Sequence, residues 1–351
     1  MAKRKTLPKD FDVIVKSGDR ETIKAVFDKC DINAYGGYGK GNALFFMLDD
    51  EMIKWCTDNG ADINYVNQYG YTPLMEHAGN YYAQQQALCL MELGADIRAE
   101  GAFPKRSVMD IAVESGSIDV VKCLIEKGID PNVKGAGDLT SLERALYIAR
   151  PFDIIRLEPV AEYLLNNGAE VTPMLKQFMT KLGKEIEFRR PDMNSEYTPQ
   201  IDAALEKMYA LLDVEPVPKR VTYDGKSKIK IKGKTWQKQH SKLWDMLVPS
   251  SGHANTVQGE VIRISGKLGY EILDNGCINW DAQYRKLVTA LEKYLHMGNM
   301  LESSEYDELA EIFKGIKNAD EKAINRMTEL CVKWVTMNTD AMPLEETEYT
   351  R

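Results

Sequence analysis

The sequence predicts an all-α protein, in which a solenoid of helical repeats is followed by a small C-terminal helical bundle. Within 107–132, apolar residues recur every three to four positions on both sides of a Ser-Gly-Ser turn at 115–117, which indicates two short antiparallel helices. The segment that ends this pair, Gly128 to Asn132, has counterparts elsewhere in the first half of the chain. Beyond Thr235 the helical periodicity continues without that ending, so a different helical module follows the repeats.

The repeated ending starts with a glycine at positions 60, 94, 128 and 168. Glycine adopts the left-handed conformation after a helix without a side-chain clash, so each of these glycines marks a helix end. The first three are evenly spaced, and an insertion around 150–153 accounts for the longer interval before the fourth. Helices shorter than about 12 to 15 residues are marginal in water, so each pair must bury its apolar stripe against neighbouring pairs.

The openings of the repeats carry a second signal. In Thr72-Pro73-Leu74-Met75 the threonine can cap a helix and the proline fits its first turn, and Ser107 to Asp110 is a weaker copy. A unit of about 33 residues with this opening resembles the ankyrin repeat, whose Thr-Pro-Leu-His motif is matched here except that Met75 replaces the histidine. The resemblance implies an ankyrin-repeat solenoid over 11–215, with capping units at both ends.

Composition and periodicity divide the chain into five segments. The third segment is a basic linker or a short hairpin on the turn Asp224-Gly225, and the fourth has the periodicity of five helices, enough for a compact bundle. The expected segments are a disordered basic N-terminus (1–10), the ankyrin repeats (11–215), the basic linker or hairpin (216–234), the helical C-terminal domain (235–337) and an acidic tail (338–351). The stretch 244–260 is also similar to a segment of short uncharacterised bacterial proteins, a resemblance that implies no particular activity.

The overall composition is that of an ordinary globular protein with two domains, since the chain has 351 residues, of which 44% are hydrophobic and 28% charged. No window approaches the roughly 18 consecutive apolar residues of a membrane span, and residues 1–9 lack the apolar core of a signal peptide. The net charge of −8 disfavours wholesale nucleic-acid binding but leaves local basic stretches open. We therefore expect no membrane partner.

The six cysteines do not indicate a disulfide framework. Cys89 and Cys123 stand at equivalent positions in the second helices of successive repeats, where each acts as a small buried hydrophobic residue. Stacked repeats place such positions about 10 Å apart, which is too far for a disulfide bridge. We expect free thiols, a reducing compartment and a cytoplasmic location.

Signals for catalysis or metal binding are weak. The glycine cluster at 35–42 lacks the preceding strand of a phosphate loop, and Lys40 is followed by glycine instead of Ser or Thr. His77 fits a packed, hydrogen-bonded ring in a first helix, and 274–281 lacks the ligand spacing of a calcium loop. We expect no metal, no cofactor and no catalytic residue, and the sequence favours a non-enzymatic protein without deciding the matter.

The ankyrin resemblance places partner binding on the turns that project as fingers and on the first helices, which line a concave face. Solvent-facing tyrosines offer an apolar body and a polar tip at a low entropy cost, and the fingers are rich in them. The candidate contact residues are Tyr35, Tyr38, Tyr65, Gln68, Tyr69, Tyr71, Phe103, Lys105, Arg106 and Lys134. The expected function is a protein–protein interaction module for a macromolecular partner. The resemblance allows an inhibitor, an immunity factor or an adaptor of bacterial or phage origin.

The C-terminal module supports an alternative, in which the repeats target a nucleic-acid-binding or enzymatic domain. Its residues Ser251, His253 and Glu260 include a nucleophile, a base and an orienting group, with Trp244 and Gln258 nearby in the sequence. A helix cap and a tight glycine turn explain the same stretch structurally. The candidate nucleic-acid contacts are three alternating lysines of the linker, Lys228, Lys230 and Lys232. The sequence names neither the partner nor the oligomeric state.

Overall fold

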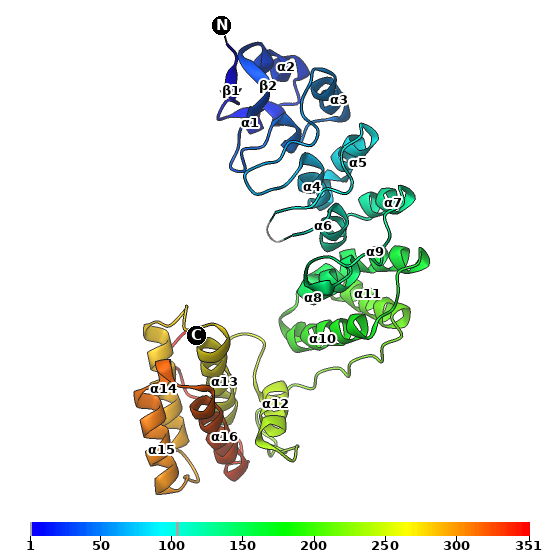
Figure 1. Cartoon of the computed structure of the whole chain (residues 1–351). Coiled ribbons are helices and arrows are strands. Elements are labelled where there is room, and N and C mark those ends of the chain that lie inside the picture. The colour runs from blue at the N-terminus through cyan, green and yellow to red at the C-terminus, as the bar shows by residue number, and fades with distance from the viewer. Residues whose placement is uncertain (1, 103–104) are drawn as a thin grey trace. The chain divides into compact units, whose positions relative to one another are not determined.

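Two compact units make up the protein in the computed structural model, which describes residues 2–102 and 105–351. The first unit runs to Ile186 and includes Asn194–Val217, and the second contains Glu187–Met193 and Pro218–Arg351. Helices dominate both units, so the predicted all-α class is confirmed (Figure 1). None of the helices in the described ranges has the length and apolar character needed to cross a membrane.

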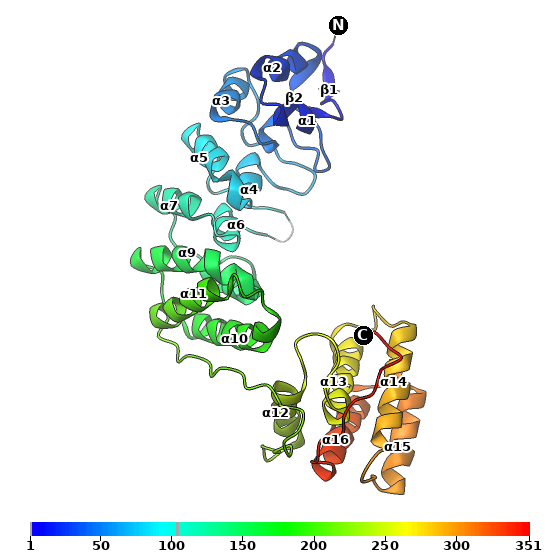
Figure 2. The same ribbon diagram turned by 180° about the vertical axis from the view of Figure 1, so that it is seen from behind.

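The first unit is a stack of short helix pairs (Figures 1 and 2). The pairs are α1 (Phe11–Lys16) with α2 (Arg20–Lys29), the 3-10 turn η1 (Ala43–Phe45) with α3 (Asp50–Asp58), α4 (Pro73–Ala78) with α5 (Gln84–Glu92), α6 (Val108–Ser115) with α7 (Ile118–Glu126), α8 (Ser141–Ile148) with α9 (Ile154–Asn166), and α10 (Pro173–Arg189) with α11 (Thr198–Leu211). First helices contact first helices, since α6 touches α4 and α8, and second helices contact second helices, since α7 touches α5 and α9. Each pair therefore covers the apolar side of the next.

Local backbone chemistry decides where these helices begin and end. The side chains of Thr72, Ser107 and Thr140 cap the starts of α4, α6 and α8, and the last two do so in capping boxes. The four repeated glycines follow second helices with φ between 81° and 94°, a region that residues with a side chain rarely adopt. The predicted helix-end signals are thus the groups that end the helices.

Asparagines of the repeated ending tie each helix pair to the next one. Asn33 Nδ2 donates to the Gly60 carbonyl (2.9 Å), and Asn33 Oδ1 accepts the backbone amide of Asp62 (2.6 Å). Asn132 makes the same two bonds: its Nδ2 donates to the Gly168 carbonyl (2.7 Å), and its Oδ1 accepts the Glu170 amide (2.9 Å). Asn64 accepts the equivalent amide of the following unit at 2.9 Å. These side chains act as staples between neighbouring units.

A small parallel sheet at the N-terminus differs from the expected disorder of residues 1–10. Strand β1 (Arg4–Thr6) pairs with β2 (Cys30–Tyr35), the extended segment that follows α2. Leu7 is buried directly after β1, and its amide donates to the Tyr35 carbonyl (2.9 Å). Because β2 leaves backbone groups without helical partners, an added strand satisfies them. This pairing was not predicted, because Arg4–Thr6 carries no alternating apolar pattern.

The second unit is a bundle centred on one helix. Its helices are α12 (Trp236–Leu247), α13 (Val257–Gly269), α14 (Ala282–Leu295), α15 (Ser303–Lys314) and α16 (Glu321–Met337). α13 contacts α12, α14 and α16, and a π-helical turn (Tyr270–Asp274) extends its end. Trp334 of α16 is fully buried in the apolar core that these helices share.

Of the two predicted forms of 216–234, a basic linker or a short hairpin on Asp224-Gly225, the hairpin does not form, because residues 218–233 contain no strand. Asp224 does form the turn, because its Oδ1 accepts the amides of the second and third residues after it (2.9 and 2.8 Å). However, the flanking residues bond elsewhere: the Tyr223 amide donates to Met246 (3.2 Å), and the Ile229 amide donates to Thr339 (2.8 Å). The Ile229 side chain is buried in the core of the second unit. Burying this apolar side chain is favoured over an exposed two-stranded ribbon.

Candidate functional site

The predicted fingers are loops between successive helix pairs, and short backbone bridges close three of them. Antiparallel bridges join Gly36 to Gly41, Glu100 to Ser107 and Lys134 to Thr140. The second finger instead turns around Asn67, whose buried side chain accepts two amides of its own loop at 2.9 and 3.0 Å. These bonds fix the backbone at the base of the first, third and fourth fingers and within the second finger.

The first two fingers are joined at their tips by Gln68. Its Nε2 donates to the Tyr38 carbonyl (2.7 Å) and its amide donates to the Gly39 carbonyl (3.0 Å). The rings of Tyr38 and Tyr69 lie 6.0 Å apart, and they are 90% and 43% exposed. Tyr35, at the base of the first finger, is also exposed. Three predicted tyrosines thus face solvent on a backbone that hydrogen bonds hold in place.

Two other predicted tyrosines pack inside the array. Tyr65 is half-buried with its ring edge-on to Phe45, at 6.2 Å. The Tyr71 hydroxyl accepts a hydrogen bond from Arg106, whose guanidinium lies 5.6 Å from the centre of the Tyr71 ring. Arg106 also pairs with Glu114 of α6 (2.7 Å). These residues support the fingers, and their side chains are less available to a partner.

The remaining predicted contacts are basic side chains near the third and fourth fingers. Lys105 pairs with Glu100 (2.8 Å) and Lys134 with Asp138 (3.1 Å), so each lysine has an acidic neighbour in its own finger. Both lysines are exposed. The predicted contact Phe103 lies outside the described residues.

An open groove of about 490 Å³ lies beside the fingers, along the first helices α4, α6 and α8. Tyr71 and Arg106 line it from the finger side, and Glu76, Glu114 and Ile148 line it from the helices. Glu114 is bonded by Arg106 and also by Arg144 of α8 (2.6 Å), so the groove contains a fixed acidic group between two arginines.

Comparison with known protein families identifies this architecture. Residues 43–135 match the family model "Ankyrin repeats (3 copies)". This part of the chain is an ankyrin array. Ankyrin repeats are protein-binding modules, so the chain carries a protein–protein interaction module. No curated protein matches the chain significantly. The family match does not extend to 244–260, so the predicted resemblance of that stretch stays an expectation.

The stack of helix pairs in the first unit also exposes aromatic residues that were not among the predicted contacts. Tyr147, at the end of α8, is 54% exposed and lies 5.2 Å from the ring of Phe178 in α10. Tyr81 and Tyr82 are exposed on the turn between α4 and α5. The available signal was their place at or just beyond the end of a first helix, where an aromatic residue is not needed for packing between repeats.

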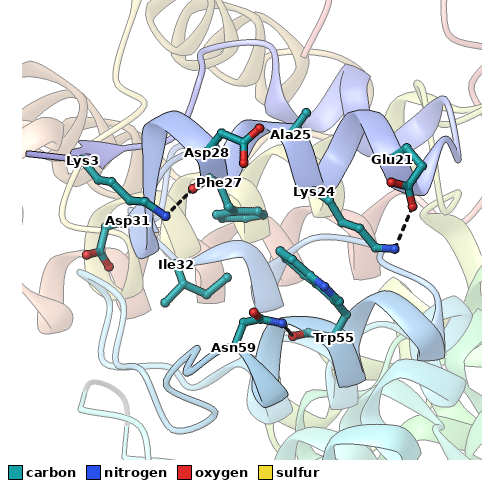
Figure 3. Close-up of a pocket in the computed structure, with 10 residues that line it drawn as sticks. All are labelled: Lys3, Glu21, Lys24, Ala25, Phe27, Asp28, Asp31, Ile32, Trp55 and Asn59. Carbon is teal, nitrogen blue, oxygen red and sulfur yellow. Dashed lines mark hydrogen bonds and ion pairs between the residues drawn. The ribbon is translucent and has the colours of Figure 1, made fainter. Parts of the chain in front are cut away.

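A second hollow of about 490 Å³ lies among α2, β2 and α3 (Figure 3). Both lysines that line it are already engaged, because Lys3 Nζ donates to the Phe27 carbonyl (2.6 Å) and Lys24 pairs with Glu21 (2.8 Å). The rings of Phe27 and Trp55 lie 5.8 Å apart at its centre. This hollow is the seam at which the N-terminal segment docks onto the ankyrin array.

The predicted nucleophile, base and orienting group do not form a catalytic arrangement. Hydrogen bonds from Ser250 and Ser251 lower the pKa of Asp192, and the Ser250 hydroxyl donates to that carboxylate. His253 Nδ1 lies 3.1 Å from Glu260, but its Nε2 is bonded to Thr347 Oγ1 (3.1 Å). The histidine therefore has no serine to activate.

Trp244 and Gln258 also have structural surroundings. The Trp244 ring packs on α13 at Gly266, where an added Cβ would lie only 2.3 Å from the indole. Gln258 is fully buried, and its Nε2 donates to the carbonyls of Asn338 (2.8 Å) and Asp340 (2.7 Å). Of the five residues predicted here, Gln258, His253 and Glu260 are brought together with the 338–351 segment.

The other chemical candidates have ordinary partners as well. The fully buried Glu271, beside the stretch considered for calcium, accepts hydrogen bonds from Asn275 (2.9 Å), Asn279 (2.6 Å) and Tyr284 (3.2 Å). In the described part of the chain, no group of three His, Cys, Asp or Glu side chains is placed to hold a metal ion. The linker lysines Lys228, Lys230 and Lys232 are all exposed, and Lys228 lies 3.6 Å from Asp340.

Proposed function

We propose that the ankyrin array binds its protein partner through the tips of the first two fingers and the adjoining groove. The exposed pair Tyr38 and Tyr69 carries this proposal. Both rings are available to a partner, while Gln68 fixes the backbone beneath them through two hydrogen bonds. Little conformational freedom is then lost on binding, and rigid, pre-organised tyrosines of this kind are frequent binding hot spots.

The groove supports the same proposal because it adds polar specificity next to the tyrosines. Glu114 is held between Arg106 and Arg144, so its carboxylate presents a fixed acceptor. Ile148 lines the groove further along the first helices and is exposed. A partner segment that lies across these helices would meet an apolar strip and a charged network together, which is typical of protein interfaces.

The proposal is tested with the partner recovered by affinity capture from the native cell and then purified. The double variant Tyr38→Ala/Tyr69→Ala is expected to weaken binding by about 2 to 4 kcal/mol, or roughly 30- to 1000-fold in Kd, measured by calorimetry. The matched control is Tyr81→Ala/Tyr82→Ala, which removes two exposed tyrosines from a helix–helix turn outside the fingers. Equal affinity of the finger variant and the wild type would exclude the fingers as the binding site.

An inhibitory, immunity or adaptor role of bacterial or phage origin is a narrower form of this proposal, in which the array covers a working surface of its partner. It is supported by the bonds that engage Ser251, His253 and Glu260 in structural contacts. We also propose a cytoplasmic location, since all six cysteines are free thiols. Adding the protein to an activity assay of the captured partner distinguishes an inhibitor from an adaptor.

The alternative of nucleic-acid binding is favoured by one observation. Lys228 and Lys230 project into solvent while Ile229 between them is buried, so the lysines are displayed along one extended segment. Such a row can contact successive phosphates. The salt dependence of nucleic-acid affinity is the measurement that separates this alternative from partner binding through the fingers.

A further inference from the structure

The segment 338–351, here called the strap, lies in an extended conformation across the helices of the second unit (Figure 2, dark red). Gln258 holds its beginning, because it donates to two strap carbonyls and accepts the Met342 amide at 3.1 Å. The Val257 amide donates back to the Met342 carbonyl (2.8 Å). These bonds are made to the backbone, so they hold an extended peptide without selecting its side chains.

The far end of the strap inserts one side chain into the bundle. Tyr349 is 3% exposed, its hydroxyl donates to Glu260 Oε1 (2.8 Å), and it lies 3.1 Å from the hydroxyl of Tyr294. The ring of His253 packs edge-on against Tyr349, at 5.1 Å. On the other side of the strap, Lys286 of α14 donates to the Glu348 carbonyl (2.9 Å). The site thus selects a tyrosine at one position of an extended segment.

The floor of this tyrosine socket is a buried ion pair on α13. Arg263 Nε donates to Glu260 Oε2 (2.8 Å), and both side chains are almost completely buried. Burial would raise the pKa of Glu260, but Arg263, the Ala254 amide and Tyr349 outweigh this effect and lower it. Glu260 therefore stays charged and accepts the hydrogen bond of the tyrosine hydroxyl. Arg263 Nη1 is buried without a hydrogen-bond partner, so the covered socket leaves one donor of this pair unsatisfied.

An unsatisfied buried donor and a desolvated ion pair oppose closure of the socket. Removing two charges from water costs several kcal/mol per ion, and departure of the strap would return water to Glu260 and Arg263. The apolar core around Trp334, to which the helices α12, α13, α14 and α16 contribute, also includes Tyr349, and Met342 and Leu344 of the strap pack against it. The strap therefore gains free energy from apolar burial and loses part of it to the desolvated ion pair, while most side chains of the shared core come from the helices themselves.

We propose that the second unit contains a binding socket for an extended, tyrosine-bearing peptide, and that the strap occupies it as a displaceable ligand supplied by the same chain. The ligand class is a segment like Leu344 to Tyr349, in which glutamates precede the tyrosine. Because the strap is joined directly to α16, its local concentration at the socket is on the order of millimolar, so it competes strongly with a peptide from another molecule. Release of the strap opens the socket to such a peptide.

The test uses the full chain and a fluorescein-labelled synthetic peptide of residues 343–351. In the Tyr349→Ala variant, hydrogen exchange is expected to rise in the strap and to stay unchanged in α14, α15 and α16. This variant is expected to bind the labelled peptide at least about 10-fold more tightly than the wild type, whose own strap competes. A matched peptide with alanine in place of the tyrosine is expected to lose that binding.

Three results would overturn the proposal. Loss of exchange protection throughout α13–α16 in Tyr349→Ala would make the strap an inseparable part of the core. A folded Tyr349→Ala variant that does not bind the peptide would show that the socket accepts no ligand. Equal peptide affinity in the wild type and in Tyr349→Ala would show that the strap does not compete. The peptide affinity of Tyr349→Phe, which keeps the ring, is expected to lie between those of the wild type and Tyr349→Ala. This variant isolates the hydrogen bond from the tyrosine hydroxyl to Glu260.

Discussion

Replacing Arg98 with asparagine should complete the row of asparagine staples that joins the ankyrin units. Arg98 stands at the position of the staple in the third unit, but an arginine side chain has no acceptor for an amide proton. Its backbone is already in the required turn, because its amide donates to Asp96 Oδ1 at 2.9 Å, as the Asn132 amide does to Asp130. The new side chain would meet the Gly128 carbonyl and the Asp130 amide.

The size of the effect follows from the bonds that Asn132 makes to the next unit, at 2.7 and 2.9 Å. A hydrogen bond contributes about 0.5 to 1.5 kcal/mol net, and exposed positions such as these belong to the lower half of that range. Two new bonds should therefore stabilise the interface between the third and fourth units by about 1 to 2 kcal/mol. Because repeats couple mainly to their nearest neighbours, the gain is confined to α5, α6 and α7.

Hydrogen-exchange mass spectrometry measures this local gain in the full chain. In Arg98→Asn, amides of α5, α6 and α7 should exchange about 5- to 30-fold more slowly, which is the rate equivalent of about 1 to 2 kcal/mol. Arg98→Gln is the matched control, since it offers the same amide group on a side chain one methylene longer. A stabilising role for the asparagine staples is refuted if both variants exchange alike, or if Asn132→Ala leaves exchange around α7 and α9 unchanged.

Three further predictions concern pH, thiols and charge. Burial lowers the pKa of His77 below 6.5, so the unfolded state takes up a proton before the folded state does, and the ankyrin array should lose stability as the pH falls through 6.5. In His77→Gln, the midpoint of urea unfolding should therefore change less between about pH 7.5 and 5.5 than it does in the wild type. Burial raises the pKa of Cys56 to about 12, so iodoacetamide at about pH 8 should label the partly exposed Cys277 at least about 10-fold faster, as peptide mass spectrometry would show. Charge reversal of the linker lysines should leave partner affinity within about twofold of the wild type, whereas a steep loss of DNA or RNA affinity at low salt would favour the alternative function; the reversed residues are Lys228, Lys230 and Lys232.

Some features of the ankyrin array were predictable because they depend on residues close together in the chain. The helix caps at Thr72 and Ser107, and the left-handed glycines after second helices, act within a few residues of themselves. The regular spacing of those glycines then predicts stacking, since short helices need neighbours. The predicted finger tyrosines followed from the same register, although it did not show that Tyr65 and Tyr71 pack inward.

Other features depend on contacts between distant residues, and sequence patterns did not contain them. β1 pairs with a strand that begins only after α1 and α2, and nothing in its own composition indicates this. Ser251 and His253 are neighbours in sequence, yet the side chain of His253 bonds to other residues, Glu260 and Thr347 among them. Proximity along the chain therefore suggested a catalytic group that the packing of the bundle separates.

The sequence by itself determined the ankyrin array, because helix starts, helix ends and the apolar period are local properties repeated along the chain. Only the tertiary structure decided which side chains face solvent and which are buried in contacts within the protein. Tyr349 belongs to a stretch that reads as a loose acidic tail, but its hydroxyl reaches Glu260, 89 residues away in sequence. Burial of that tyrosine is decided by the shape and charge of a site assembled from α13 and α14, which no local pattern encodes.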